Sequence, residues 1–210
     1  MNNKALDLLK KTGAILTQNH FVGTSGLHFD TYINKDALYP HTEETSEMGN
    51  LFAEKNKDLD IDVVAAPAMG GIILSTWTAH HLSRLKGKEI LGIYTEKNID
   101  KDQVFTRGYD AYVKNKNVLI VEDLTTTGGS VKKVVDTVQR AGGNVVQVCV
   151  MVNKDPDKVN SDLMGVPFSS LAELKVTTYS ADECPLCKDG VPVNTSIGHG
   201  KKFLDSKKSA

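Results

Sequence analysis

The chain of 210 residues is long enough for one domain with a well-buried core, and its 40% hydrophobic and 24% charged residues exclude collagen-like, coiled-coil and wholly disordered proteins. Its 25 basic and 26 acidic residues leave a net charge of -1, so we expect neither nucleic acid nor a membrane surface as partner. No stretch approaches the ~20 apolar residues of a membrane span, and the first twenty residues lack the apolar core of a secretion signal. We therefore expect a cytoplasmic protein.

Strands and helices are predicted to alternate along the middle of the chain. Helices are indicated by amphipathic patterns over 6–11 (ending at Gly13), 43–57, 72–85 and 131–141. Buried strands of a mostly parallel sheet are indicated by β-branched runs over 62–66, 89–94, 117–121 and 144–150. Ser130 is placed to cap the helix over 131–141, and Gly142 and Gly143 to end it.

This alternation predicts one α/β domain over 1–210, with a mostly parallel sheet flanked by helices in a core from about 45 to 152. Segments 14–40 and 153–200 lack this alternation of strands and helices, and we expect them to form a small cap, or hood, over the core. Residues 201–210 form a polar tail that we expect to fray.

The strongest motif runs from Val118 to Ser130, where an apolar strand is followed by two carboxylates and a loop of threonines and glycines. Ligands of open α/β sheets bind at the carboxyl ends of the strands. Threonine hydroxyls, backbone N–H groups freed by glycine and a helix N-terminus together suit a phosphate monoester. The predicted phosphate loop consists of Thr125, Thr126, Thr127, Gly128, Gly129 and Ser130.

Glu122 and Asp123 precede this loop and would repel a polyphosphate unless they faced something else. Carboxylates accept hydrogen bonds from vicinal hydroxyls, so the pair is placed to hold a ribose whose 5′-phosphate lies in the loop, with Mg²⁺ nearby. The familiar nucleotide-binding glycine loops do not occur in a suitable context. A purely structural role explains Asp123, Gly129 or Ser130 singly, but not the whole run.

Residues 118–130 resemble the phosphoribosyl pyrophosphate (PRPP) signature of the type I phosphoribosyltransferases. The resemblance implies that Glu122 and Asp123 bind the ribose hydroxyls of PRPP, that the following loop wraps its 5′-phosphate, and that Mg²⁺ is the cofactor. It implies no ligand of the protein's own for that ion, which would be held mainly through PRPP. Asp123 is accordingly a candidate catalytic residue.

A second loop, from Ala66 to Gly71, follows the strand over 62–66 and opens a helix. Its two glycines tolerate backbone angles that let N–H groups approach an anion, although a tight strand–helix turn explains the residues equally well. The resemblance assigns the pyrophosphate of PRPP to this loop. The residues concerned are Ala68, Met69, Gly70 and Gly71.

The polar stretch over 95–109 is long for a connection within a core, and such loops are usually lids or disordered. It carries Lys97, Lys101 and Arg107, which could neutralise the leaving pyrophosphate and expel water. A solvated charged loop is the alternative. Its borders resemble those of one branch of the orotate phosphoribosyltransferases, which favours Lys97 and Arg107 as catalytic and pyrophosphate-binding residues.

The ends of the chain also resemble the orotate branch. Residues 25–35 resemble its Ser-Gly-centred hood segment, and residues 184–192 resemble its tail. His28, Tyr32 and Lys35 are therefore candidate contacts of the base. Thr24 stands where many orotate enzymes have a lysine, and the lid lacks the dense basic cluster of the better-known branch.

The resemblance implies transfer of the phosphoribosyl group from PRPP to a nucleobase, with orotate and pyrimidine biosynthesis favoured, by a homodimer whose lid reaches the neighbouring site. Two alternatives remain open. One is a phosphoribosyltransferase that acts on another base, and the other is a PRPP-binding regulatory protein without turnover.

The three cysteines do not form a disulfide framework. Cys149 lies in an apolar run and is predicted to pack in the core. Cys184 and Cys187 have the spacing of half a zinc site, for which His199 is the one later candidate ligand. We favour a structural or dimer-contact role for the pair and keep the zinc site as the alternative.

Overall fold

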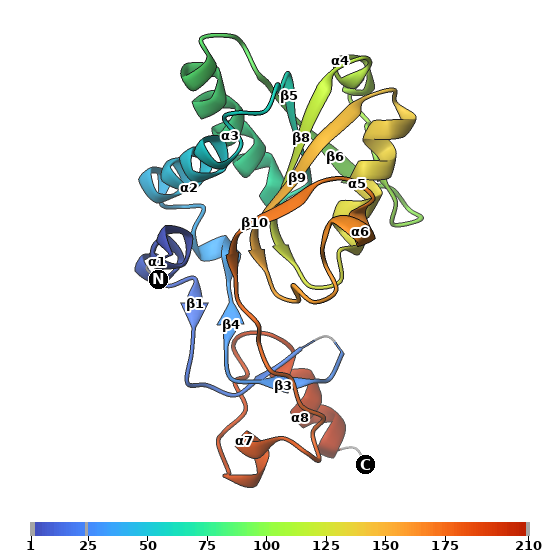
Figure 1. Ribbon diagram of the computed structural model, residues 1–210. Coiled ribbons are helices and arrows are strands. Elements are labelled where there is room, and N and C mark those ends of the chain that lie inside the picture. Colours follow the sequence, from blue (N-terminus) through green and yellow to red (C-terminus); the bar gives the residue numbers. More distant parts are fainter. Residues whose placement is uncertain (1–2, 24, 209–210) are drawn as a thin grey trace.

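The computed structural model describes residues 3–23 and 25–208, and within them six strands form the central sheet, in the order β10-β9-β8-β5-β6-β7 (Figure 1). The first five are mutually parallel, and only β7 is antiparallel to its neighbour. The strands are β5 (Val63–Pro67), β6 (Leu91–Lys97), β7 (Gln103–Val104), β8 (Asn117–Thr125), β9 (Asn144–Asn153) and β10 (Phe168–Glu173).

Helices cover both faces of this sheet (Figure 1). On one face lie α1 (Lys4–Lys11), α2 (Thr42–Lys55) and α3 (Gly70–Lys86); on the other lie α4 (Asp110–Val113), α5 (Gly129–Arg140) and α6 (Ser161–Met164). Successive strand residues point to opposite faces, so each strand contributes to two apolar clusters. Val64 packs with α1, α2 and α3, whereas Val63 packs with α5. The predicted α/β class is confirmed.

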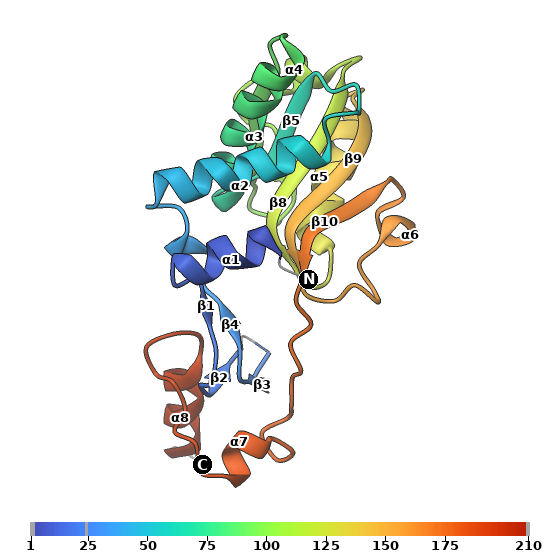
Figure 2. The same ribbon diagram turned by 60° about the vertical axis from the view of Figure 1, so that its left-hand side comes forward.

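The hood lies at the lower end of the molecule, beyond the carboxyl ends of the strands (Figures 1 and 2). Two short antiparallel pairs build its N-terminal half, β1 (Ile15–Leu16) with β4 (Tyr32–Ile33) and β2 (Phe21–Val22) with β3 (His28–Phe29). A 3-10 turn, η1 (Lys35–Ala37), leads back to the core. The C-terminal half follows β10 as an extended segment that ends in α7 (Pro185–Lys188) and α8 (Gly200–Lys208).

The structure corrects the predicted boundary between core and hood. The segment over 153–200 is not all hood, because β10 extends the central sheet by pairing with β9. It was missed because β10 is mostly half-buried and contains the adjacent Ser169 and Ser170, which weaken its apolar signal.

The tail predicted to fray is helical through Lys208, and residues 209–210 lie outside the described part. Phe203 on α8 packs edge-to-face against His28, with ring centroids 4.6 Å apart, which gives the helix an apolar anchor. The predicted cap is also wrong: Gly128 is the N-cap of α5 and Ser130 lies inside its first turn.

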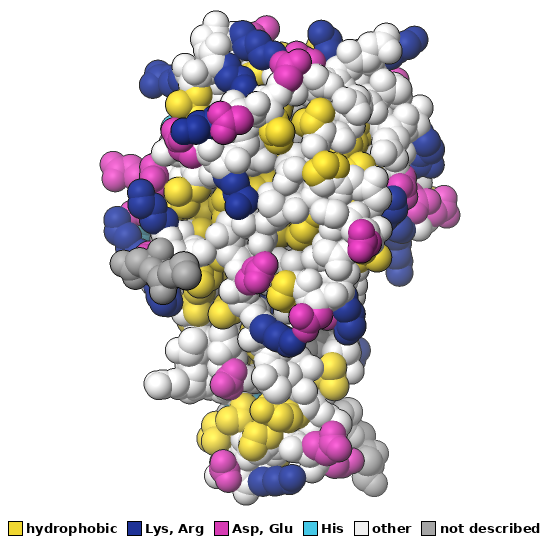
Figure 3. All heavy atoms as spheres, viewed as in Figure 1, with side chains coloured by type: hydrophobic (Ala, Val, Ile, Leu, Met, Phe, Trp, Pro, Cys, Tyr) yellow, Lys and Arg dark blue, Asp and Glu magenta, His cyan; other side chains and the backbone are white. Residues whose placement is uncertain are grey.

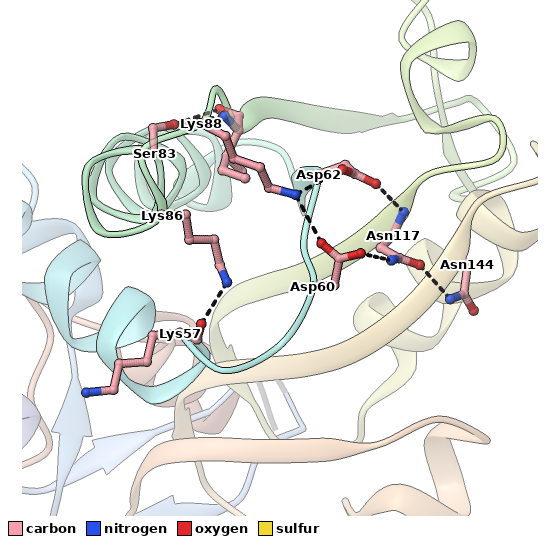
Figure 4. A network of polar contacts seen from close by, with 9 residues as sticks. Lys57, Asp60, Asp62, Ser83, Lys86, Lys88, Asn117 and Asn144 are labelled. Atoms are coloured by element: carbon pink, nitrogen blue, oxygen red, sulfur yellow. Dashed lines mark hydrogen bonds and ion pairs between the residues drawn. The ribbon is translucent and has the colours of Figure 1, made fainter.

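A polar network ties together the amino ends of the strands, at the edge of the sheet opposite the hood (Figure 4). The Asn117 side chain donates to Asp60 and accepts from Asn144, and Lys88 bonds both Asp60 and Asp62. The Asn117 backbone N–H is the main cause that lowers the pKa of Asp62. The polar side chains at this edge of the sheet therefore bond to one another.

Figure 3 shows Lys and Arg side chains interspersed with Asp and Glu over the core, and hydrophobic side chains gathered at the hood end of this face. Within residues 3–23 and 25–208, no helix combines the length and apolar character that crossing a bilayer requires.

Candidate active site

A cavity of about 300 Å³ opens at the carboxyl ends of β5, β6 and β8, where an open α/β sheet places its ligands. Its walls bring together the acidic pair, the loop after β5 and the lid, three motifs that lie far apart in the sequence. The described residues that line it are Lys35, Pro67, Ala68, Met69, Gly70, Lys97, Gln103, Glu122, Asp123, Leu124 and Ser130.

Asp123 is the most connected side chain of this cavity. Its Oδ2 accepts hydrogen bonds from the Lys35 ammonium at 2.5 Å and from the Tyr39 hydroxyl at 3.0 Å, and its Oδ1 accepts from the backbone N–H of Leu124 at 2.6 Å. Burial opposes the charge of Lys35, but attraction to Asp123 outweighs it and raises the pKa of Lys35. Burial, and then Asp123, raise the pKa of Tyr39. The carboxylate is thus held in one orientation.

Glu122 is buried like Asp123, and one of its oxygens accepts the backbone N–H of Asp123 at 2.9 Å. Burial, and then the neighbouring charge of Asp123, raise the pKa of Glu122 above that of a free glutamate. The two neighbouring carboxyl groups therefore differ, because among the described residues only Asp123 has a cation within ion-pair distance.

The loop from Ala66 to Gly71 forms the wall opposite the acidic pair. Its close approach requires glycine: a Cβ on Gly70 would lie 2.2 Å from Asp123 Oδ2, and one on Gly71 would lie 2.7 Å from the Ala66 Cβ. A cis peptide bond joins Ala68 to Met69, and the Met69 side chain is 82% exposed. The loop thus presents backbone rather than side chains to the cavity, as the prediction for an anion requires.

The loop from Thr125 to Ser130 turns the chain from β8 into α5. The Thr125 hydroxyl accepts the Gly128 N–H at 3.1 Å, and Gly128 has a φ of +76°, a left-handed conformation that favours glycine. Thr126 and Thr127 stay exposed and line a second cavity, whereas Ser130 lines the first. The predicted phosphate loop therefore borders both cavities and begins a 12-residue helix.

The lid is a β-hairpin rather than a structureless loop, because β7 folds back on β6. Lys97 lies on the cavity side, next to the buried Thr95–Gln103 side-chain hydrogen bond of 2.7 Å. Arg107, predicted to act with it, is absent from the described lining of the cavity. It pairs instead with Glu96 at 3.2 Å, and neighbouring strand residues face opposite sides. Lys101 lies at the turn, also outside the lining.

The second cavity, of about 910 Å³, separates the hood from the phosphate loop. Phe29 and Tyr32 line it from the hood, and Lys154 and Lys158 line it from the segment after β9. Burial lowers the pKa of Lys154, which forms no ion pair with the residues that the structure describes. We did not predict Lys154 from the sequence; its signal was its place directly after a parallel strand adjacent to β8.

The three predicted base contacts fall in three different places. Tyr32 lines the large cavity, with its ring stacked on Phe29 and tilted against Phe21. Lys35 lies in the smaller cavity, on Asp123. His28 does not line either cavity, because it is fully buried within the hood. Thr24 lies outside the described residues.

The comparisons with known proteins agree with this geometry. Residues 34–167 match the family model "Phosphoribosyl transferase domain", and the chain therefore belongs to that family.

Its relatives narrow the family to one branch. The chain is 38% identical over 190 residues to an orotate phosphoribosyltransferase of Caldanaerobacter subterraneus subsp. tengcongensis, covering 90% of this chain and 94% of that one. It is 36% identical over 197 residues to the Thermotoga maritima enzyme of the same name, covering 93% and 98%. The solved orotate phosphoribosyltransferase of Mycobacterium tuberculosis H37Rv shares the fold, with a TM-score of 0.65 and 23% identity over 82% of this chain and 97% of that one. The chain thus falls in the orotate branch.

Proposed function

We propose that this chain transfers the 5-phosphoribosyl group of PRPP to orotate, which yields orotidine 5′-monophosphate and pyrophosphate. The observation that carries the proposal is that consecutive residues of one motif line two cavities: Glu122, Asp123 and Ser130 line the smaller, and Thr126 and Thr127 line the larger. A ribose 5-phosphate held there directs its anomeric carbon toward both cavities, so the leaving group and the base each have their own space. The two relatives named above support orotate as the base.

In the proposed reaction, N1 of the orotate anion forms a bond to the anomeric carbon as the bond to pyrophosphate breaks, and pyrophosphate keeps the electron pair. Neither a covalent nucleophile nor a dedicated general base is required. Catalysis then rests on holding the ribose, stabilising the leaving group and excluding water. Asp123 and Glu122 hold the ribose hydroxyls, and Lys97 with the Ala68–Gly71 backbone receives the pyrophosphate.

The residues of the smaller cavity fit Mg²⁺ brought in with PRPP. The ion prefers oxygen ligands and is usually bound by one or two carboxylates together with substrate phosphates. Asp123 and Glu122 offer such oxygens at the cavity wall, but both already accept hydrogen bonds from the chain, which suits an ion held mainly through the substrate. When bound, Mg²⁺ would neutralise charge on the departing pyrophosphate.

Lys154 supplies the base end of the proposed site with a cation. Orotate carries a carboxylate, which pairs with a half-buried ammonium such as that of Lys154 more strongly than with one in open solvent. Phe29 and Tyr32 offer the planar apolar surface against which a pyrimidine ring packs. Lys154 thereby supplies a cation in place of the hood lysine of many orotate enzymes, at whose position this chain has Thr24.

A homodimer is part of the proposal. Ile99, at the turn of the lid hairpin, is 96% exposed, which suits a contact with a second copy of the chain. Sedimentation of the wild-type chain tests it, and a monomer contradicts it. Mixing a Lys97→Ala chain with an Asp123→Ala chain tests separately whether the lid serves the partner's site. Activity that stays at the level of the separate variants keeps Lys97 in the cavity of its own chain, which it lines in the structure. Location in the cytoplasm stays a prediction.

The proposed activity is tested by measuring pyrophosphate release from PRPP and Mg²⁺ with orotate, uracil, adenine, hypoxanthine and guanine offered separately. We expect turnover with orotate alone and none without Mg²⁺. Turnover with another base would show that this base, and not orotate, is the substrate, and the proposed mechanism of transfer from PRPP would stand. No pyrophosphate release with any of the five bases, together with PRPP binding measured by calorimetry, contradicts the proposed activity and favours a regulatory protein.

Replacing Asp123 tests the placement of the site. Asp123→Ala is expected to abolish detectable turnover while the circular dichroism spectrum stays that of the parent. Asp102→Ala is the matched control, because Asp102 is an exposed acid on the lid that pairs only with Lys133. Near-normal turnover by Asp123→Ala overturns the assignment.

A further inference from the structure

Two histidines and two cysteines converge inside the hood, away from both cavities. His20 directly precedes β2 and His28 lies on β3, whereas Cys184 and Cys187 come from α7 and the residue before it. One ligand atom of each lies within 4.8 Å of those of the other three. His20, His28 and Cys184 are fully buried. The proposed transfer reaction uses none of them.

The distances match those between the ligands of a tetrahedral zinc ion. Bonds of 2.0–2.1 Å to nitrogen and 2.3 Å to sulfur place nitrogen and sulfur about 3.6 Å apart. The Cys184 and Cys187 sulfurs lie 3.7 and 3.8 Å from His20 Nε2, and the Cys187 sulfur lies 3.4 Å from His28 Nδ1. The two imidazole nitrogens lie 2.7 Å apart, against about 3.3 Å around zinc, so a small opening of this pair admits the ion.

The surroundings of His20 favour metal binding. Its other ring nitrogen, Nδ1, lies 2.8 Å from the backbone oxygen of Val191. Nδ1 therefore carries the proton, and Nε2 presents its lone pair to the cluster. Histidines that bind zinc are oriented by this kind of hydrogen bond to a carbonyl or carboxylate.

Without a metal, the cluster leaves polar groups poorly satisfied. A hydrogen bond from His28 Nδ1 to His20 Nε2 accounts for one contact, but His28 Nε2 is then buried with no hydrogen-bond partner in the described part of the chain. Two thiols, which are weak donors, point at nitrogens already engaged with each other.

The cluster also lies at the junction of the two halves of the hood. The N- and C-terminal halves of the hood meet through isolated bridges, His20 with Val193 and His28 with Tyr179. Its buried apolar side chains are few, chiefly Phe21, Val22 and Phe29. Units too small to bury a sufficient core commonly depend on a metal or disulfides.

We propose that His20, His28, Cys184 and Cys187 bind one structural Zn²⁺, which joins the two halves of the hood. Four protein ligands fill the tetrahedral shell, so no position is open for substrate. Binding replaces the two thiol protons, which pass to solvent, and leaves a neutral site of two thiolates and two imidazoles. The sequence alone pointed to His199 as the partner of the cysteines; the structure supplies the two upstream histidines instead.

The wild-type full chain gives the first test. After expression with zinc supplied and gel filtration, we expect one equivalent of zinc per chain by plasma mass spectrometry. Cobalt exchanged into the site should give the visible bands of a tetrahedral Co²⁺ ion and a thiolate-to-cobalt charge-transfer band. A chain that takes up neither ion, or that holds iron instead when both metals are supplied, overturns the proposal.

Variants assign the ligands. Cys184→Ser/Cys187→Ser and His20→Asn should each lose at least tenfold in zinc affinity and the cobalt spectrum. Cys149→Ala and His41→Gln, which remove a cysteine and an exposed histidine outside the cluster, should keep both. Full zinc content in the double cysteine variant overturns the assignment, as does a Cys184–Cys187 disulfide in metal-free protein purified with zinc present.

A stability measurement separates a structural site from surface binding. A strong chelator should lower the midpoint of thermal unfolding of the wild-type chain and leave that of the double cysteine variant unchanged. Equal shifts in both contradict a structural role. None of these readouts depends on the transferase reaction, so failure of one proposal leaves the other standing.

Discussion

The Lys35 ammonium lies 2.5 Å from Asp123 Oδ2, although the two residues are 88 positions apart in the sequence. Lys35 enters the site from the 3-10 turn that links hood to core, and Asp123 lies near the end of β8. This contact joins the hood side of the molecule to the acidic pair. It also means that Lys35 must leave Oδ2, or share it, when a ribose hydroxyl binds there.

The first prediction concerns this ion pair. Lys35→Ala leaves the buried Asp123 beside Glu122 without a cation, and we expect a loss of about 1–3 kcal/mol in the free energy of unfolding. Adding Asp123→Asn to Lys35→Ala should recover more than half of the loss, since a neutral amide needs no counter-charge. Urea unfolding of the four proteins of this cycle measures the coupling.

Lys88→Ala is the control for that cycle. Lys88 also bonds two aspartates, but its side chain is 42% exposed, so its removal should cost less than about 1 kcal/mol. A coupling between Lys35 and Asp123 no larger than this value contradicts the prediction.

The second prediction concerns Gly70. A methyl group there would lie 2.2 Å from Asp123 Oδ2 and 2.6 Å from the Tyr39 hydroxyl, so both side chains must move. Gly70→Ala should therefore lower turnover at least tenfold and cost about 1–3 kcal/mol of stability. Steady-state kinetics and thermal unfolding measure the two effects.

Gly143→Ala serves as its matched control. A Cβ there meets Val138 at 2.7 Å and the Val113 backbone oxygen at 3.0 Å, outside the candidate site. It should lower stability by a similar amount but leave kcat of the folded protein unchanged. Equal kinetic effects of the two substitutions would show that general destabilisation, rather than the displaced Asp123, lowers turnover.

How far the sequence predicts this site depends on whether the motifs are local. The strand–acid–glycine run of β8 and α5 is contiguous, so its chemistry could be interpreted before the fold was known. Lys154 reaches the site through tertiary folding and looks like an ordinary surface lysine in the sequence. Lys35 was a candidate through the resemblance of its segment, but as a contact of the base, and its ion pair with Asp123 appears only in the folded chain. Only the cysteines of the hood cluster could be identified as possible zinc ligands from the sequence, because Cys184-x-x-Cys187 is a recognisable spacing. His20 and His28 are brought to them only by folding of the hood. Arg107 shows the converse: a plausible lid cation turns out to be paired with Glu96.

The third prediction ranks the lid cations. Lys97 lines the pyrophosphate end of the cavity, so Lys97→Ala should lower kcat about 100-fold, the usual cost of removing one group that stabilises developing charge. Arg107→Ala should cost less than about tenfold, because Arg107 pairs with Glu96 and its guanidinium lies 5.8 Å from the centre of the Tyr94 ring. Single-turnover rates with orotate compare them. A larger loss from Arg107→Ala would show that the hairpin rearranges during the reaction.

The fourth prediction concerns the base. Lys154→Met keeps the length of the side chain and removes its charge, and we expect the KM for orotate to rise at least tenfold while that for PRPP changes little. Lys158→Met is the matched control, because Lys158 is 80% exposed at its side chain and already pairs with Asp155 at 3.1 Å. Initial-rate measurements with each substrate varied distinguish the two. Equal effects of both substitutions, or a rise in the KM for PRPP alone, would remove Lys154 from the base site.

The last prediction concerns pH and Glu122. Burial, and then Asp123, raise the pKa of Glu122, so the folded chain keeps a proton there over an interval in which the unfolded chain has lost it. The stability from this group is fully present below the ordinary glutamate pKa of about 4.3 and is lost as the pH rises through the raised value. Glu122→Gln stays neutral, so its free energy of unfolding relative to wild type should increase as the pH rises from about 5 to about 8. Urea unfolding across this interval, with the exposed Glu89→Gln as control, measures the difference. Parallel curves for wild type and Glu122→Gln would show that Glu122 is ionised in the folded chain, and the proposed hydrogen bonding to ribose would then involve two carboxylates.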